Sequence, residues 1–238
     1  MGNKVTPVGF RIGFTKEWKS CWWAKDGLYR TLFLEGYKIK RIIKEELDVF
    51  NIEDVLIERA LEIINIFIYC PDPGIVIGKD GERINELDSL LNSIFKKKMR
   101  INVCKVHNKN LSAPSIMAFI RDKIDERVSY KRAVKQAMNV AMESHAEGIK
   151  VIISGRIGGA EIARSEKFTQ GKIPAHTLRA NIDFCSGVVE TVYGTLGLKV
   201  WVYKGEVYKN SQPLLTIPQE PTRKNEKKNV REKYYPKR

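Results

Sequence analysis

Residues 73–84 constrain the fold of this chain more than any other stretch. They read P-G-I-V-I-G-K-D-G-E-R-I, with an apolar run before Gly78 and a helical pattern after Gly81. Glycines at both ends of a four-residue loop permit backbone angles and close approaches that a side chain would block. The free N–H groups of the following helical turn point at any anion in the loop. The pattern predicts a loop that opens a helix and can hold a phosphate.

The segments around this loop predict a complete small domain. An amphipathic segment at 37–47 comes first, strand-like runs at 55–60 and 63–69 precede the loop, and another at 100–106 follows its helix. With the short turn before the glycines counted as a helix, this order resembles the type II KH arrangement, whose G-x-x-G loop clamps an RNA backbone. The alternative is that G-x-x-G is only a turn, as it usually is when it stands alone.

Four loop residues are therefore candidate RNA contacts: Gly78, Lys79, Gly81 and Arg83. Asp80 departs from the usual pattern, because a carboxylate inside a phosphate clamp repels its ligand. The sequence leaves open whether this loop holds RNA or belongs to a packed scaffold.

The amino-acid composition narrows the classes of molecule that this chain is expected to bind. Among 238 residues, 42 are Lys or Arg and 28 are Asp or Glu, a formal net charge of +14. Such an excess favours nucleic acid as partner, with an anionic membrane surface second. No apolar run is long enough to span a membrane. Four cysteines and three histidines are scattered without metal-ligand spacing, so we expect reduced thiols, no metal site and no cofactor.

The chain divides into four predicted parts. Residues 1–16 form a basic N-terminal arm that either stays flexible or orders on RNA, and Lys4 and Arg11 are its candidate contacts. Residues 17–107 form the KH-like domain, 108–208 a C-terminal α+β domain, and 209–238 a basic tail that is predicted to be disordered. Four aromatic residues between positions 18 and 29 either stack on bases or pack the arm onto the first domain.

The C-terminal part opens with two predicted helices, at 116–128 and 130–145, separated by a break near Ser129. Lys131, Arg132 and Lys135 share an arc of about 100° opposite an apolar face. No acidic residue lies between Ser129 and Met142. These three cations are candidate RNA contacts; the alternative is an ordinary solvated helix face.

A mainly antiparallel sheet is predicted to follow, with strands near 149–154, 182–192 and 198–203 and a turn at 194–197. Residues 155–166 are Gly-rich but lack the G-K-[ST] ending of a P-loop. We interpret them as a turn that exposes Arg156 and Arg164 to RNA. Helices followed by a sheet give an α+β class for this half.

Several long, collinear motifs then carry a family resemblance. They are M-G-x-K-x-x-P-x-G-x-R-x-G at the start, the G-x-x-G stretch, Y-K-R-A-V-K-Q-A (130–137), I-S-G-R-I-G-G-A-E-I-A-R-S-E (153–166), I-P-A-H-T-L-R-A-N-I-D (173–183) and Y-G-T-L-G-L-K-V-W-V-Y-K-G-E (193–206). Over residues 1–208 the chain resembles the bacterial-type small ribosomal subunit protein S-three family. The tail lies outside the match.

The resemblance implies a structural protein in the head of the small subunit of a cytoplasmic ribosome of bacterial or organellar type. It implies binding to small-subunit ribosomal RNA and contacts with the tenth and fourteenth proteins of that subunit. Arg179, within the motif at 173–183, is a further candidate RNA contact. The resemblance also implies a place at the messenger RNA entry channel. There the family's basic helix face, here Lys131, Arg132 and Lys135, is associated with unwinding incoming message without ATPase activity.

Two other classes compete with this interpretation. A free-standing KH regulator would share the RNA chemistry without the ribosome. A nuclease or lyase, an activity credited to some relatives, would need a carboxylate cluster or an activated lysine, and no motif supplies one. We therefore predict a non-enzymatic RNA-binding protein without a membrane partner.

Overall fold

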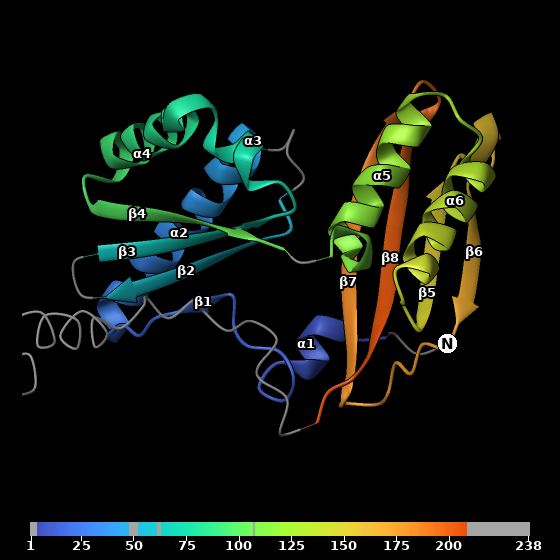
Figure 1. The fold of residues 1–238 in the computed structure, drawn as a ribbon, viewed down its shortest axis with the longest axis horizontal. Coiled ribbons are helices and arrows are strands. Elements are labelled where there is room, and N and C mark those ends of the chain that lie inside the picture. The colour runs from blue at the N-terminus through green and yellow to red at the C-terminus, as the bar shows by residue number, and fades with distance from the viewer. Residues whose placement is uncertain (1–3, 48–51, 61–62, 107, 209–238) are drawn as a thin grey trace, which may run out of the picture.

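The computed structural model describes residues 4–47, 52–60, 63–106 and 108–208. The predictions for the tail at 209–238 lie outside these ranges. Within them the chain forms two lobes, each a four-stranded sheet with helices against one face (Figure 1). The architecture confirms the α+β class.

The first lobe has the type II KH order of elements. β2 pairs antiparallel with β3, and β3 pairs parallel with β4. A short strand, β1 (Ser20–Cys21), adds to the outer edge of β2 in parallel. The remaining elements are α2 (Asp26–Leu47), β2 (Asp54–Ala60), β3 (Ile63–Cys70), α3 (Pro73–Ile77), the 3-10 turn η2 (Lys79–Gly81), α4 (Glu82–Phe95) and β4 (Lys98–Lys105).

Its core follows from alternation in β3. Ile64, Ile66 and Ile68 point to the same side, where they pack with buried residues of α2, α3 and α4. Helix α2 begins at Asp26, well before the predicted start at 37. Its first turns carry exposed aromatic side chains, such as Tyr29 and Phe33, both 54% exposed, and these obscure the amphipathic pattern.

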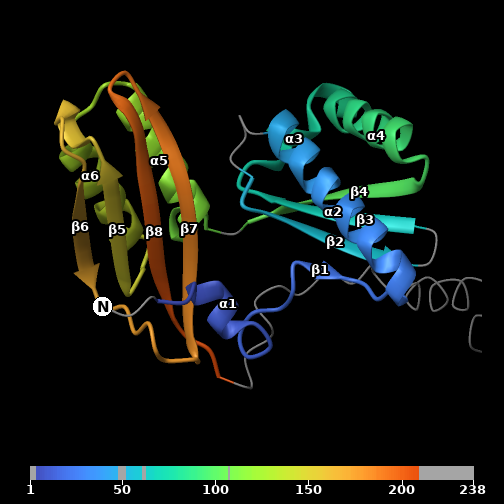
Figure 2. The same ribbon diagram turned by 180° about the vertical axis from the view of Figure 1, so that it is seen from behind.

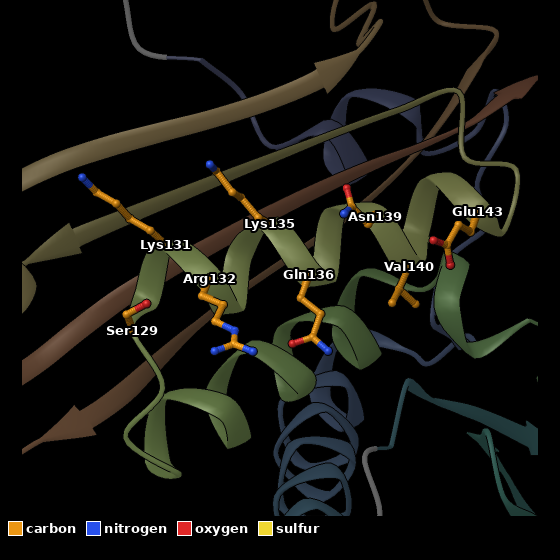
Figure 3. A pocket seen from close by; sticks show the side chains of 8 residues that line it. All are labelled: Ser129, Lys131, Arg132, Lys135, Gln136, Asn139, Val140 and Glu143. Atoms are coloured by element: carbon orange, nitrogen blue, oxygen red, sulfur yellow. The ribbon is translucent and has the colours of Figure 1, made fainter.

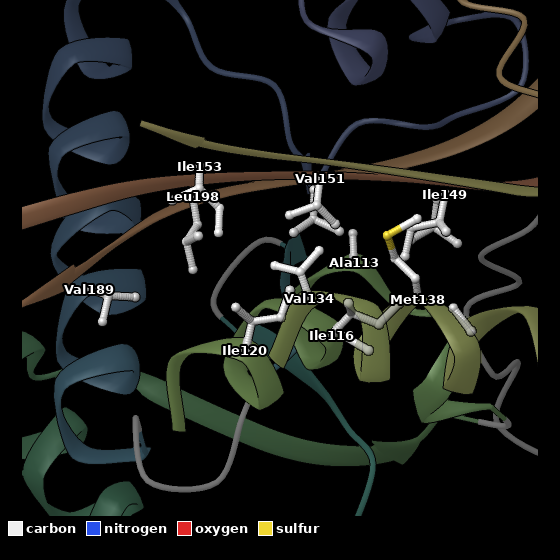
Figure 4. Close-up of a cluster of buried hydrophobic side chains, with 14 of the residues drawn as sticks. Ala113, Ile116, Ile120, Val134, Met138, Ile149, Val151, Ile153, Val189 and Leu198 are labelled. Atoms are coloured by element: carbon white, nitrogen blue, oxygen red, sulfur yellow. The ribbon is translucent and has the colours of Figure 1, made fainter. Parts of the chain in front are cut away.

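The second lobe is two helices on one face of an antiparallel sheet. α5 (Ala113–Asp125) and α6 (Tyr130–Glu143) are separated at Ser129, as predicted. Apolar residues of both helices and of the strands form one buried cluster (Figure 4). The strands run in the order β6-β5-β8-β7: β5 (Gly148–Gly155), β6 (Arg164–Gly171), β7 (Ala180–Thr191) and β8 (Gly194–Glu206). Short 3-10 turns, η3 (Lys109–Leu111) and η4 (Ile157–Gly159), complete this half.

Two details of this sheet differ from the sequence prediction. Strand β6 was missed because it is an edge strand with polar residues on both faces and only Phe168 against the core. Residues 194–197 form no turn, since they already belong to β8. Leu196 and Leu198 alternate into the core there, while Gly197 allows a close approach: a Cβ on it would lie 2.9 Å from Ser154 Oγ.

The N-terminal segment, residues 4–21, is not a separate arm. Its helix α1 (Pro7–Arg11) packs against β7 of the second lobe, and its strand β1 joins the sheet of the first lobe (Figure 2). The segment therefore contacts both lobes: α1 packs on β7, and β1 pairs with β2. No helix within the described ranges is long and apolar enough to cross a membrane.

Candidate nucleic-acid interface

Helix α6 presents a cationic surface to solvent. It begins after Ser129, whose carbonyl accepts the backbone N–H of Arg132 at 2.9 Å. Ala133, Val134, Ala137 and Met138 are buried against the sheet and α5. We define the α6 face as the exposed residues Lys131, Arg132 and Lys135 on the opposite side.

No ion pair within the described ranges neutralises the positive charge of the α6 face. Within the described ranges none of its three cations pairs with a carboxylate; Lys131 Nζ instead lies 5.8 Å from the ring centre of Tyr130. Lys131 and Lys135 project to one side of the helix and Arg132 to the other (Figure 3). They line a shallow depression of about 670 Å³ that also includes Gln136, Asn139 and, toward the end of the helix, the carboxylate of Glu143. Such a surface suits a phosphate backbone.

Arg164 adjoins the start of this face. Its Nε lies 3.2 Å from Glu166 Oε1, to which Tyr130 donates a hydrogen bond of 3.3 Å. Since Tyr130 is the first residue of α6, this contact places Arg164 near Lys131. The Glu166 carboxylate neutralises part of the Arg164 charge, whereas the α6 face keeps all of its own.

The G-x-x-G loop has the positive φ angles that its glycines permit. Gly78 and Gly81 have φ of 78° and 80°, and Asp80 lies in the left-handed region at φ 53°. Asp is one of the few side chains that adopts this region readily, which explains its presence. Lys79 is exposed, and Arg83 donates a 3.3 Å hydrogen bond to Ile75 O. The charges of residues 79–83 (two basic, two acidic) cancel.

Arg156 and Arg179 are exposed and lie at opposite ends of the second sheet: Arg156 follows Gly155, which pairs with Arg164, whereas Arg179 precedes Ala180, which pairs with Glu206. Arg156 donates to Ala160 O at 3.0 Å and to Tyr193 O at 3.2 Å, and so braces the loop after β5. Arg179 lies beyond the other end of the sheet, where its Nε is 2.7 Å from Glu206 Oε2. Both stay predictions as RNA contacts.

Arg11 is a correction to the predicted site. Its side chain is 0% exposed and its guanidinium donates only to backbone carbonyls. Those hydrogen bonds include Nε to Ala180 O at 2.7 Å, Nη2 to Thr177 O at 2.9 Å and Nη1 to Pro7 O at 3.0 Å. No phosphate can reach it. A basic residue in a basic segment predicts an RNA contact, and nothing local in the sequence marks it as internal.

Lys4 remains exposed and lies near lysines that the sequence analysis missed. The pKa of Lys150 is lowered first by burial and then by the charges of Lys167 and Lys4, so these groups are neighbours. Lys199 shares their side of the sheet. The signal that could have found them is strand alternation: an apolar residue follows each of these lysines on β5 and β8.

The described residues hold no group of three His, Cys, Asp or Glu side chains placed to bind a metal ion. All four cysteines are free thiols. Burial, with a smaller effect of Asp72, raises the pKa of the Cys70 thiol to about 11, so it is protonated at neutral pH. Cys70 is therefore a packed, unreactive thiol.

A type II KH domain joined to an α+β domain with a cationic helix face defines the class of KH-type RNA-binding proteins. The KH domain family matches residues 38–111, and the family "Ribosomal protein S3, C-terminal domain" matches residues 120–202. The chain is 40% identical over 228 residues to "Small ribosomal subunit protein uS3" of Synechocystis sp., covering 94% of this chain and 95% of that protein. It is 43% identical over 207 residues to the protein of the same name from Staphylococcus aureus, covering 87% and 95%. The chain belongs to the uS3 family, whose members are named as ribosomal proteins and not as enzymes.

Proposed function

We propose that this protein, a structural and non-enzymatic constituent of the small ribosomal subunit in the cytoplasm, binds small-subunit ribosomal RNA and lines the messenger RNA entry channel. Membership of the uS3 family supports the ribosomal role. The observation that carries the RNA proposal is the α6 face: three exposed cations without carboxylate partners in the described part of the chain.

The geometry of α6 suits an unpaired strand. Lys131 and Lys135, one helical turn apart, offer point charges along one side, while the planar fork of Arg132 can hold a phosphate in two places on the other. A surface that binds unpaired message better than duplex shifts a duplex end toward its open form. That shift needs differential affinity and no nucleotide hydrolysis.

The test is the triple variant Lys131→Ala, Arg132→Ala and Lys135→Ala in the full chain, with affinity for oligouridine measured across salt concentrations. The slope of log K against log salt should flatten by about 2, because each phosphate that a cation neutralises contributes about 0.7 to it. A matched control is Lys38→Ala, Lys44→Ala and Lys109→Ala, three exposed lysines outside the proposed sites. An unchanged slope together with a lower melting temperature would make the α6 cations structural.

The proposal extends to neighbours in the subunit, the tenth and fourteenth small-subunit proteins. Cross-linking of assembled subunits followed by mass spectrometry tests these contacts directly. Co-sedimentation with ribosomes through a high-salt wash separates a ribosomal component from a free-standing KH regulator, which would be washed away.

A further inference from the structure

The face of the second sheet that points away from α5 and α6 carries cations and aromatic rings in register. Ile149, Val151 and Ile153 of β5 point to the helices, so the alternate residues point outward. Figure 2 shows this outer face turned to the viewer, with α1 near one end and no helix across its middle. Two rows of residues run across the strands on this face. In the first, Lys150 of β5 lies beside Trp201 of β8, which lies beside Phe184 of β7. In the second, Lys167 of β6 and Lys199 of β8 flank Ile152 of β5.

The three lysines of these rows have no carboxylate partner in the described ranges. Lys167 and Lys199 are exposed, and Lys150 is half-buried with its Nζ 4.6 Å from the ring centre of Trp201. Glu190, on the same face by register, lies two rows beyond Lys199 toward the β7–β8 turn. Lys4 adds to the positive charge. The outer face is therefore cationic over its middle.

The aromatic rings beside the lysines distinguish this face from a plain basic patch. The centroids of Phe184 and Trp201 are 5.0 Å apart at 42°, and both rings are partly exposed. Lysines for phosphates next to rings for bases are the combination that binds unpaired nucleic acid. Lys167 and Lys199 stand two strands apart, roughly 10 Å, so each can take a different phosphate.

The outer face also adjoins the α6 face. Edge strand β6 alone separates them, because Glu166 turns toward Tyr130 at the start of α6 while the next residue, Lys167, turns to the outer face. A single RNA strand can pass from one face to the other around this edge.

We propose that Lys150, Lys167 and Lys199, the sheet lysine face, form a second binding surface for unpaired RNA, continuous with the α6 face across β6. This inference rests on the RNA binding proposed above and adds a surface to it. The lysines hold phosphates, and the partly exposed rings of Trp201 and Phe184 contact bases.

The experiment uses the full chain with Lys150→Gln, Lys167→Gln and Lys199→Gln, because Gln keeps part of the aliphatic stem that packs on Trp201. Affinity is measured for oligouridines of about 6 and about 24 nucleotides, lengths that fit one face or span both. For the longer RNA the salt slope should flatten by about 2. The control with Lys38, Lys44 and Lys109 replaced by Gln should keep the parent slope, and intrinsic tryptophan fluorescence checks the packing around Trp201.

The two proposals fail separately. Loss of affinity only in the α6 variant, with the sheet variant equal to the control, would overturn the sheet surface and leave the α6 face standing. A stronger effect of the sheet variant on duplex than on oligouridine would overturn the choice of unpaired RNA. Lysine-dependent binding to anionic vesicles, with RNA binding unaffected, would overturn RNA as the occupant.

Discussion

At the scale of residues, burial separates two roles that the sequence cannot tell apart. Arg11 and Lys131 are both cations in basic surroundings, yet the first is enclosed by backbone carbonyls and the second is exposed. Burial lowers the pKa of Arg11, but a guanidinium remains charged, and it has no carboxylate partner within hydrogen-bonding distance in the described ranges. Five carbonyl contacts satisfy it instead.

Arg11→Lys should therefore destabilise the protein while leaving RNA contacts intact. An ammonium group cannot reproduce the planar fork, so carbonyls in the 174–180 segment lose their donors, at a cost of about 2–4 kcal/mol. Urea denaturation measures the loss. The salt slope of RNA binding, measured where the variant is folded, should equal that of the parent chain. A flatter slope with unchanged stability would restore Arg11 as a phosphate contact.

At the scale of elements, strongly periodic segments were predictable and edge segments were not. The helix break at Ser129 follows from two apolar stripes that do not superpose, and the KH order follows from the runs around the loop. Strand β6 has a single core residue, and β1 has only two residues, so neither leaves a periodic signal. The α6 face was predictable because a helix fixes its own geometry. The sheet lysine face required the register of three strands.

The G-x-x-G loop gives a prediction at this scale. Asp80→Asn keeps a residue that tolerates the left-handed backbone and removes the carboxylate, whereas Lys would add strain at φ 53°. If the loop contacts phosphates, affinity for oligouridine should rise about two- to fivefold, which is the effect of one exposed charge after screening. Glu86→Gln, an exposed charge loss on the following helix, is the control. Equal affinities for both variants would mean that the loop is scaffold.

At the scale of the whole molecule, two carboxylates tie separate parts of the chain together: Asp183 of β7 binds Lys16 of the N-terminal segment, and Glu53 links the two lobes. The pKa of Asp183 is lowered from its usual value. Burial alone would raise this pKa, but the positive charges of Lys16 and Lys204 and the hydrogen bond from the Ala113 N–H outweigh burial. Glu53, before β2, accepts a 3.2 Å hydrogen bond from Ser115 of α5. Burial raises the pKa of Glu53, with smaller opposing effects from Ser112, Lys204 and Ser115.

The raised pKa of Glu53 determines how this residue changes protein stability with pH. Ionisation is disfavoured in the folded state, so Glu53 destabilises the protein at neutral pH, and this cost disappears as pH falls below its unfolded pKa. Glu53→Gln keeps the acceptor for Ser115 and should raise the melting temperature at pH 7 by about 1–2 °C. Thermal unfolding between pH 7 and 4 should show the difference shrinking to zero. Glu161→Gln, an exposed charge loss, should have no such effect; a gain that persisted at pH 4 would exclude the linkage.

The contact between Arg11 and Ala180 has a consequence for the order of synthesis. A ribosome making this chain completes residue 11 long before residue 180, because 169 positions separate them. The first lobe lies inside that closed loop, and among the described residues its buried core consists only of residues between Ile39 and Val103, so that core needs no residue of β7. Closing so long a loop costs little more than closing one half its length, about 0.6 kcal/mol per doubling, but the closure comes late. Helix α1 therefore cannot pack against β7 until nearly all of the described chain has left the ribosome.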